Sequence, residues 1–461
     1  MNLVPCLHRT ASPRHDSHVA GWLAAGTISA EKKENNESGK RGAGNMVTGE
    51  LLDSRYAWLR LLAALVIATI GGIGLWSAVV VLPTSQQEFG VGRGGASVPY
   101  TATMVGFAAG GVFMGRLADR RGIMIPLLIG TVVLGLGFIT AGMTGSYLQF
   151  ILAQALLIGM LGSSATFGPL VAEISLWFQR RRGIAVAIVA SGNYLAGAIW
   201  PPLLQQAIQA YGWRSAYIGI GILCLVTMLP LALLFRRRAP GVQAAAARHA
   251  AKSGEVTSIA ALVAPAKVPG YLQGALMFAG IACCVAMSMP QVHMIAYCGD
   301  LGYGPARGAE MLSIMLFMGV ISRLASGLIA DRIGGIGTLI LGSTLQCLAL
   351  IFYLPFDGLM SLYIVSALFG LSQGGIVPSY ALIVRDYFPA RQAGIRVSLV
   401  LMSTVVGMAL GGWMSGAIFD LTGSYRAAFL NGIGWNLVNM AIAFWLLMRR
   451  RGARLVTLSA V

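Results

Sequence analysis

The chain contains twelve predominantly apolar stretches, each close to the length that a helix needs to cross a bilayer. They are residues 57–82, 98–118, 123–143, 148–173, 184–207, 214–235, 270–297, 309–330, 335–355, 359–384, 396–418 and 427–448. At a rise of about 1.5 Å per residue, about 20 residues cross the hydrocarbon core. Because lipid offers no hydrogen-bond partners, the backbone of such a stretch must be helical. The pattern predicts an all-α membrane protein.

Composition and charge agree with this fold class. Of the 461 residues, 56% are hydrophobic and only 11% are charged, which is more apolar surface than a soluble domain buries. The net charge of +17 does not indicate a nucleic-acid partner, because the basic residues flank the apolar stretches instead of forming one stripe. The expected partner is the lipid bilayer, and we expect the chain to act as a monomer.

The positions of Lys and Arg predict an orientation. If both termini lie in the cytoplasm, the cytoplasmic loops beyond the N-terminal tail hold twenty of these residues and the outer loops hold four. Positive residues concentrate on the cytoplasmic side of membrane proteins, so the distribution favours this orientation and an even number of spans. We predict a multi-pass protein of a cell membrane, the inner membrane of a bacterium.

The spans fall into two groups of six. We predict an N-terminal bundle at 57–235, a basic cytoplasmic linker at 236–269, a C-terminal bundle at 270–448 and a cytoplasmic tail at 449–461. Residues 1–56 are polar and lack periodicity, which is typical of a disordered tail. Met46 is a candidate for the true start of translation.

One short sequence occurs twice, closing the second span and the eighth. Residues 115–122 read Gly-Arg-Leu-Ala-Asp-Arg-Arg-Gly, and residues 327–334 read Gly-Leu-Ile-Ala-Asp-Arg-Ile-Gly. Its place in each half predicts a duplicated six-helix bundle. We expect the glycines to allow close packing and the Asp–Arg pairs to form a cytoplasmic electrostatic latch. The gating residues assigned in this way are Gly115, Asp119, Arg120, Gly327, Asp331 and Arg332.

Two more titratable residues are candidates for coupling or gating. Glu173 lies at the cytoplasmic end of the fourth span, where we expect it to join the latch network, with proton carriage as the alternative. His293 lies near the outer end of the seventh span, and an imidazole titrates near physiological pH. It is either a structural residue or a proton-coupling or gating group.

Arg323 is the candidate substrate-binding residue. The stretch 311–330 contains no other charge, and Arg323 precedes Asp331 by about two helical turns, which places it near mid-membrane. A buried arginine is costly and is kept for a partner or a substrate, and its planar guanidinium suits a carboxylate. The alternative is pairing with a neighbouring carboxylate or with helix-end carbonyls. Other polar candidates, each equally suited to helix–helix hydrogen bonding, are Asn193, Tyr194, Gln373 and Tyr380.

The sequence lacks signatures of the main classes of enzyme. It contains no paired embedded carboxylates, no nucleophile-elbow motif and no phosphate-binding loop for ATP. Four of the six cysteines lie in apolar spans, so we expect no disulfide framework, no metal site and no cofactor. Gly407–Gly411 and Gly412–Gly416 in the eleventh span are expected to pack against other helices.

The duplicated signature and the two groups of six spans resemble the major facilitator superfamily over the whole chain after residue 56. A narrower resemblance lies in Trp177-Phe178-Gln179-Arg180-Arg181-Arg182-Gly183-Ile184-Ala185 and Ala190-Ser191-Gly192-Asn193. These runs are similar to a segment of the monocarboxylate porters and of their bacterial relatives, including oxalate–formate antiporters. Arg323 falls where that family has its substrate-binding arginine.

The chain also departs from that family. The first-span lysine of the animal porters aligns with Thr84, and their eighth-span aspartate aligns with Gly319. An eleventh-span lysine of the oxalate exchangers has no counterpart except Arg396 at the cytoplasmic mouth. The resemblance therefore implies that the anion-holding charge is kept while the proton-relay charges are missing.

The sequence predicts a secondary transporter of a small organic anion, most simply a monocarboxylate, that works by alternating access. Either protons accompany the substrate or one anion exchanges for another. The alternative is a major facilitator exporter of drugs or other organic compounds. That alternative expects an embedded acid to attract cationic cargo, and the spans contain no central Asp or Glu.

Overall fold

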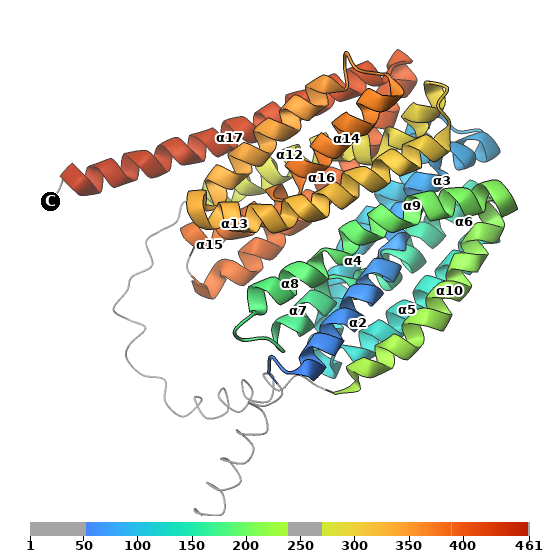
Figure 1. Ribbon diagram of the computed structural model, residues 1–461, viewed down its shortest axis with the longest axis horizontal. Helices are drawn as coiled ribbons and strands as arrows, with labels where there is room; N and C mark the ends of the chain where they lie inside the picture. Colours follow the sequence, from blue (N-terminus) through green and yellow to red (C-terminus); the bar gives the residue numbers. More distant parts are fainter. Residues whose placement is uncertain (1–51, 238–269, 389, 460–461) are drawn as a thin grey trace, which may run out of the picture.

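The computed structural model describes residues 52–237, 270–388 and 390–459, which form two bundles of helices with no strand among them (Figure 1). The N-terminal bundle comprises α2 (Arg55–Gly71), α3 (Ile73–Phe89), α4 (Arg93–Arg121), α5 (Met124–Gly142), α6 (Tyr147–Leu152), η1 (Ala153–Gly162), η2 (Ser163–Thr166), α7 (Gly168–Ser175), α8 (Arg182–Ala190), α9 (Gly192–Tyr211), α10 (Trp213–Leu233) and η3 (Leu234–Arg236). The C-terminal bundle comprises α12 (Gly270–Asp300), α13 (Pro305–Phe352), α14 (Leu359–Gln373), α15 (Ile376–Tyr387), α16 (Ala390–Thr422) and α17 (Tyr425–Ser459). The all-α fold predicted from the sequence is confirmed.

The helices correspond in order to the predicted spans. Ten segments of the described chain are long and apolar enough to cross a membrane. One of them, α13, has 48 residues, about 72 Å if straight, and it bends at Gly334, so it accounts for two spans. The helix α4 has 29 residues and lies where the second span was predicted, but it is not one of these ten segments. The start at Met46, most of the linker at 236–269 and the predicted tail up to residue 51 lie outside the described residues. The last residues assigned to that tail are a correction, because α2 already begins at Arg55 and Ser54 caps it.

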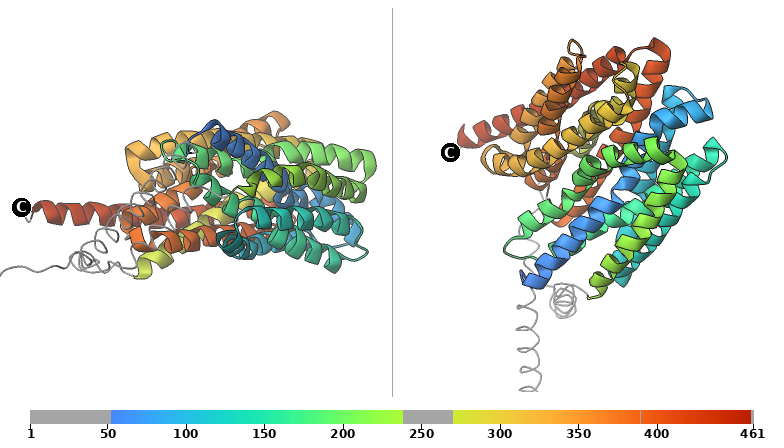
Figure 2. Two further views of the ribbon diagram at one scale, coloured as in Figure 1. Left: turned by 90° about the horizontal axis from the view of Figure 1, so that it is seen from below. Right: turned by 45° about the vertical axis from the view of Figure 1, so that its right-hand side comes forward.

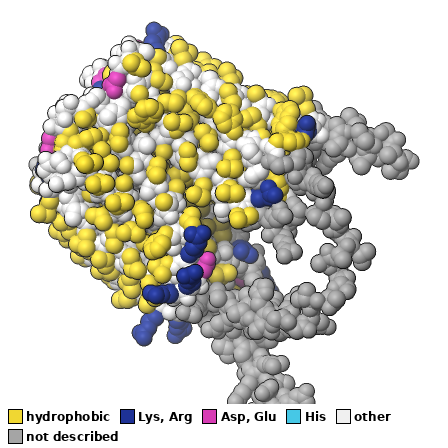
Figure 3. Space-filling model, turned by 180° about the vertical axis from the view of Figure 1, so that it is seen from behind, with side chains coloured by type: hydrophobic (Ala, Val, Ile, Leu, Met, Phe, Trp, Pro, Cys, Tyr) yellow, Lys and Arg dark blue, Asp and Glu magenta, His cyan; other side chains and the backbone are white. Residues whose placement is uncertain are grey.

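The surface has the character expected of a protein in lipid. Apolar side chains cover most of the face in Figure 3, and Lys and Arg gather mainly along its lower edge. Large apolar side chains such as Val226 and Leu328 are exposed by 66% and 69%. In Figure 2 the two bundles lie side by side, and α17 extends beyond them to Ser459, past the span end predicted at 448.

The duplicated signature has the same backbone shape in both halves. Gly122 has φ 85° and ψ 162°, and Gly334 has φ 76° and ψ 169°. A positive φ is costly for a residue with a Cβ atom, so each copy ends in glycine where one helix turns into the next.

The two bundles meet along α4 with α16, α9 with α13, and α3 with α12. A Cβ atom at Gly407 or Gly411 would lie 2.5 Å from a backbone oxygen of α12. At Gly416 it would lie 2.7 Å from the backbone oxygen of Arg93 in α4. The packing role predicted for the eleventh-span glycines is confirmed. Gly407 and Gly411 pack against α12, and Gly416 packs against α4.

Several spans are interrupted near their middle, which frees backbone groups for other bonds. The first breaks at Gly72, the fifth at Ser191 and the tenth between α14 and α15, while the fourth contains π-helical and 3₁₀ turns in η1 and η2. The first and fourth interruptions touch, because Ser163 Oγ donates to the Gly71 oxygen at 3.0 Å. These breaks place irregular backbone in the interior of the protein.

Adjacent glycines in α4 provide a test of this packing. A Cβ atom at Gly110 would lie 1.7 Å from the Met160 backbone oxygen, whereas one at Gly111 would have no neighbour within 4 Å. We expect Gly110→Ala to lower the apparent Tm in detergent by about 5 °C or more, because overpacking costs about 1–3 kcal/mol. Gly111→Ala should leave the Tm unchanged or raise it. Equal Tm values for both variants would contradict the packing of α4 on η1.

Candidate functional site

Arg323 reaches across the interface between the bundles. It lies on α13 and is half-buried. Its Nη1 donates to the backbone oxygen of Ala190 at 3.0 Å, and Ala190 is the last residue of α8, at the break in the fifth span. Its guanidinium carbon lies 4.3 Å from the centre of the Tyr194 ring. A helix-end carbonyl and an aromatic face are both favourable for a cation.

These contacts leave part of the guanidinium without an acceptor. Its Nε is buried and has no acceptor, and the ion pairs of the described residues do not include Arg323. Of the two partners that the sequence left open, the helix-end carbonyl is present, and no carboxylate of the described residues pairs with Arg323. A buried donor without an acceptor costs free energy, which a bound carboxylate would recover.

Tyr194 and Gln373 lie beside Arg323. A Cβ atom at Gly319, one turn before Arg323, would lie 2.5 Å from the Tyr194 ring and 3.6 Å from Gln373 Nε2. The ring therefore occupies the space that a side chain at 319 would need. Gln373 is fully buried, and its Oε1 accepts from Gln291 at 2.5 Å, while its Nε2 has no acceptor.

The other two polar candidates point elsewhere. The Tyr380 hydroxyl donates to Asn439 Oδ1 at 2.7 Å, and Asn439 Nδ2 donates to Ser343 at 2.8 Å, so Tyr380 belongs to a hydrogen-bond chain inside the C-terminal bundle. The backbone oxygen of Asn193 accepts from Trp76 at 3.2 Å, and its Oδ1 is buried without a donor. Asn193 is thus adjacent to the Arg323 group through Tyr194, but faces the first span.

His293 lies apart from the Arg323 group. It is completely buried, with Nε2 2.8 Å from the Gly412 oxygen and Nδ1 3.1 Å from the Tyr425 hydroxyl. Ser97 Oγ lies 3.5 Å from Nε2. A neutral imidazole that donates through Nε2 and accepts at Nδ1 satisfies both main contacts. These contacts favour the structural reading of His293 over proton coupling.

The end of the molecule that carries both signatures is called here the signature end. Asp119, Arg120, Asp331 and Arg332 are exposed, and they make no ion pair within the described chain. The expectation of close packing at Gly115 and Gly327 is wrong for this conformation, since a Cβ atom at either would have no neighbour within 4 Å.

Glu173 binds a residue that the sequence reasoning did not single out. Its carboxylate accepts from Arg60 at 2.8 Å and from the Trp177 indole at 2.9 Å. Arg60 is 1% exposed and also donates to the backbone oxygens of Leu234 and Arg237. This network joins the first, fourth and sixth spans of one bundle, whereas the expected partner was the latch. An arginine one turn into an apolar span was the signal that could have identified it.

A second carboxylate, that of Asp53, holds the loop that follows Trp177. Asp53, just before α2, accepts from the backbone N–H groups of Gln179 at 3.2 Å and Arg180 at 3.1 Å. Burial opposes ionisation, but these donors and the positive charge of Arg180 lower the pKa of Asp53. The Trp177–Arg182 segment is therefore anchored from within its own bundle.

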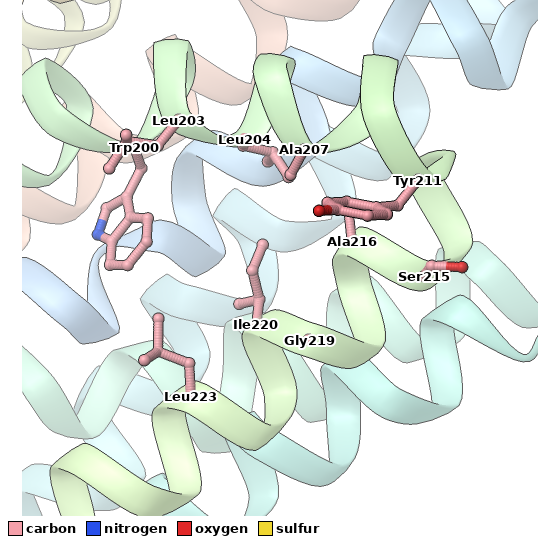
Figure 4. Close-up of a pocket in the computed structure, with 10 residues that line it drawn as sticks. All are labelled: Trp200, Leu203, Leu204, Ala207, Tyr211, Ser215, Ala216, Gly219, Ile220 and Leu223. Atoms are coloured by element: carbon pink, nitrogen blue, oxygen red, sulfur yellow. The ribbon is translucent and has the colours of Figure 1, made fainter.

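A separate cavity of about 420 Å³ lies between α9 and α10 (Figure 4). Trp200, Leu203, Tyr211, Ile220 and Leu223 contribute to its mostly apolar lining. None of the residues around Arg323 lines it, so it is distinct from the candidate site.

Comparison with known proteins agrees with this architecture. The rat protein Monocarboxylate transporter 13 is 25% identical over 391 residues, covering 82% of this chain and 86% of its own. MFS-type transporter pynF of Aspergillus niger is 25% identical over 339 residues, covering 72% and 74%.

Solved structures share the fold. A bacterial homologue of the human lysosomal transporter Spinster, in an inward-facing and occupied conformation, has a TM-score of 0.65 at 14% identity, covering 86% of this chain and 97% of its own. A POT family transporter in complex with 5-aminolevulinic acid has a TM-score of 0.65 at 12% identity, covering 84% and 95%. The family model described as Major Facilitator Superfamily matches residues 64–394 and 338–460. The chain belongs to the Major Facilitator Superfamily of transporters.

Proposed function

We propose that the protein is a secondary transporter of a small organic anion, a monocarboxylate, which binds Arg323 between the two bundles. The observation that carries the proposal is the half-buried guanidinium, whose Nε has no acceptor and which no carboxylate pairs in the described chain. One unpaired cation suits one carboxylate. The similarity to a protein named as a monocarboxylate transporter supports the same class of cargo.

An exporter of other organic compounds is the second candidate, because several similar fungal proteins are named only as MFS-type transporters. Cationic cargo would require an acid near the site. The groups that lie beside Arg323 include the Tyr194 ring, Gln373 and the Ala190 carbonyl, all of them uncharged at neutral pH. This electrostatic environment favours an anion.

We also propose that the signature end faces the cytoplasm of a bacterial cell and that the structure is the inward-facing state. The positive-inside distribution of Lys and Arg supports the orientation. The exposed and unpaired Asp119 and Asp331 support the state, because a closed cytoplasmic side would bring the two signature loops against the opposite bundles.

For energy coupling we propose anion exchange. With a carboxylate bound, the charge of Arg323 is balanced, and without it a partly buried cation would have to change sides uncompensated. His293 lies outside the Arg323 group and is bonded as a neutral side chain would be. The empty carrier should therefore return slowly, and a second anion should speed its return.

Substitutions at Arg323 test the binding proposal. In proteoliposomes supplied with a panel of labelled carboxylates, we expect Arg323→Ala to lower uptake about 100-fold, as for loss of a charged hydrogen-bond partner. Arg323→Lys should also be strongly impaired, because an ammonium lacks the planar fork. Arg307→Lys, exposed on the same helix and paired with Glu310, is the control and should transport normally. Normal uptake by a correctly inserted Arg323→Ala variant would overturn the proposal.

The coupling proposal has its own test. Proteoliposomes preloaded with unlabelled substrate should take up labelled substrate whether or not a pH gradient is imposed, and His293→Gln should retain exchange that does not depend on the pH gradient. Accumulation driven by the pH gradient in vesicles without preloaded anion, and lost in His293→Gln, would show proton symport instead.

The latch at the signature end should control rates and leave binding nearly unchanged. We expect Asp119→Asn to slow turnover about threefold to tenfold while the substrate Kd changes by less than about threefold, since Asp119 is exposed at the signature end. Asp357→Asn, an exposed carboxylate in the C-terminal bundle, is the control. Loss of equilibrium binding in a folded Asp119→Asn protein would contradict this role.

A further inference from the structure

An ion pair joins the two bundles at the end opposite to the signatures. Arg93 is the first residue of α4, and its Nη2 donates to both carboxylate oxygens of Asp300, at 2.9 and 3.1 Å. Asp300 is the last residue of α12, in the other bundle. The Arg93 side chain is only 10% exposed, so solvent screens this pair less than a surface pair.

A second carboxylate of the C-terminal bundle caps the same helix. Asp420 of α16 accepts from the backbone N–H groups of Arg93 and Gly94, both at 2.7 Å. The residue at the N-cap position of α4 is Gly92, which has no side chain to satisfy these groups. The positive end of the helix thus receives its counter-charge from the opposite bundle.

Glycine residues allow the start of α4 to lie this close to α16. A Cβ atom at Gly92 would lie 2.7 Å from Asp420 Oδ2, and one at Gly94 would lie 3.0 Å from the Ala417 backbone nitrogen. The run Gly92-Arg93-Gly94 therefore combines a charge with close access to α16.

His293 links the helices of the C-terminal bundle that surround this ion pair. Its hydrogen bonds connect α12 to Gly412 in α16 and to Tyr425 in α17. The rings of Phe419 and Tyr425 lie 4.9 and 5.8 Å from the guanidinium carbon of Arg93. The arginine is enclosed by two carboxylates and two aromatic rings, all from the C-terminal bundle.

We propose that Arg93, Asp300 and Asp420 are the gate that closes this end of the transport pathway, with His293 as a positioning residue that braces it. The proposal rests on alternating access between the bundles and does not depend on which cargo is carried. Arg93 and α4 must leave Asp300 and Asp420 for this end to open, so the contacts exist in one state only. Such contacts shift the population toward that state.

Distance measurements by pulsed electron paramagnetic resonance test the gate without any cargo. Spin labels are placed at Gln87→Cys and Leu421→Cys, exposed positions of the two bundles near the gate, in the full chain carrying Cys6→Ser. The other five cysteines are buried. In lipid nanodiscs the wild-type gate should give mainly one short distance. Asp300→Asn and Asp420→Asn should each raise the fraction at longer distance about tenfold, as expected for loss of a charged hydrogen bond.

The control is an ion pair at the same end within one bundle. Glu88→Gln breaks the ion pair between Glu88, whose side chain is 36% exposed, and Arg214, whose side chain is 38% exposed. This variant should leave the distances between the spin labels unchanged. His293→Gln should give a smaller increase than the gate variants. If Asp420→Asn is not monodisperse, Asp300→Asn decides, because that side chain is 37% exposed and its loss should not prevent folding.

Distance distributions for Asp300→Asn that match those of Glu88→Gln would overturn the gate. The same measurement on Arg323→Ala separates the two proposals. If the gate proposal is right, adding Asp300→Asn to the Arg323→Ala variant should also raise the fraction of molecules with the longer spin-label distance. This result should not depend on how Arg323→Ala affects transport.

Discussion

One cation, Arg323, is held between the two bundles by contacts that do not neutralise it. Arg323 is fixed by a single hydrogen bond to a helix-end carbonyl and by the face of the Tyr194 ring, and both partners belong to the other bundle. Neither partner carries a full negative charge, so the guanidinium is oriented without being neutralised. The orientation of the guanidinium therefore depends on the relative position of the two bundles.

Helix interruptions and glycines make this arrangement possible. The break at Ser191 frees the Ala190 carbonyl, and Gly319 leaves room for the Tyr194 ring. A Cβ atom at Gly374 would lie 2.6 Å from the Arg323 backbone nitrogen, so the tenth span can approach α13 only because glycine stands there. A larger residue at 319 or 374 would displace the elements that surround the cation.

Much of this could be predicted from the sequence, because bilayer thickness gives each apolar stretch its length and the signature repeats at the same place in each half. Arg323 was identifiable as a lone charge in an apolar span, and Tyr194 and Gln373 as polar side chains in similar spans. Sequence reasoning missed the importance of Arg60 and Arg93, because the partners Glu173, Asp300 and Asp420 come from distant parts of the chain. It also assigned Gly115 and Gly327 to close packing, but a Cβ atom at either glycine would have no neighbour within 4 Å in this structure.

The central claim, that the site recognises a carboxylate by its charge, is tested most directly by ligand-induced thermal stabilisation of the purified protein. A series of short monocarboxylates should be compared with the corresponding neutral amides, which have nearly the same shape. A ligand that binds the folded state alone, at 100 times its Kd, stabilises it by about 2.7 kcal/mol, which is readily detected as a rise in Tm. We expect that at least one acid raises the Tm and that its amide does not. Equal stabilisation by an acid and its amide would contradict the central claim.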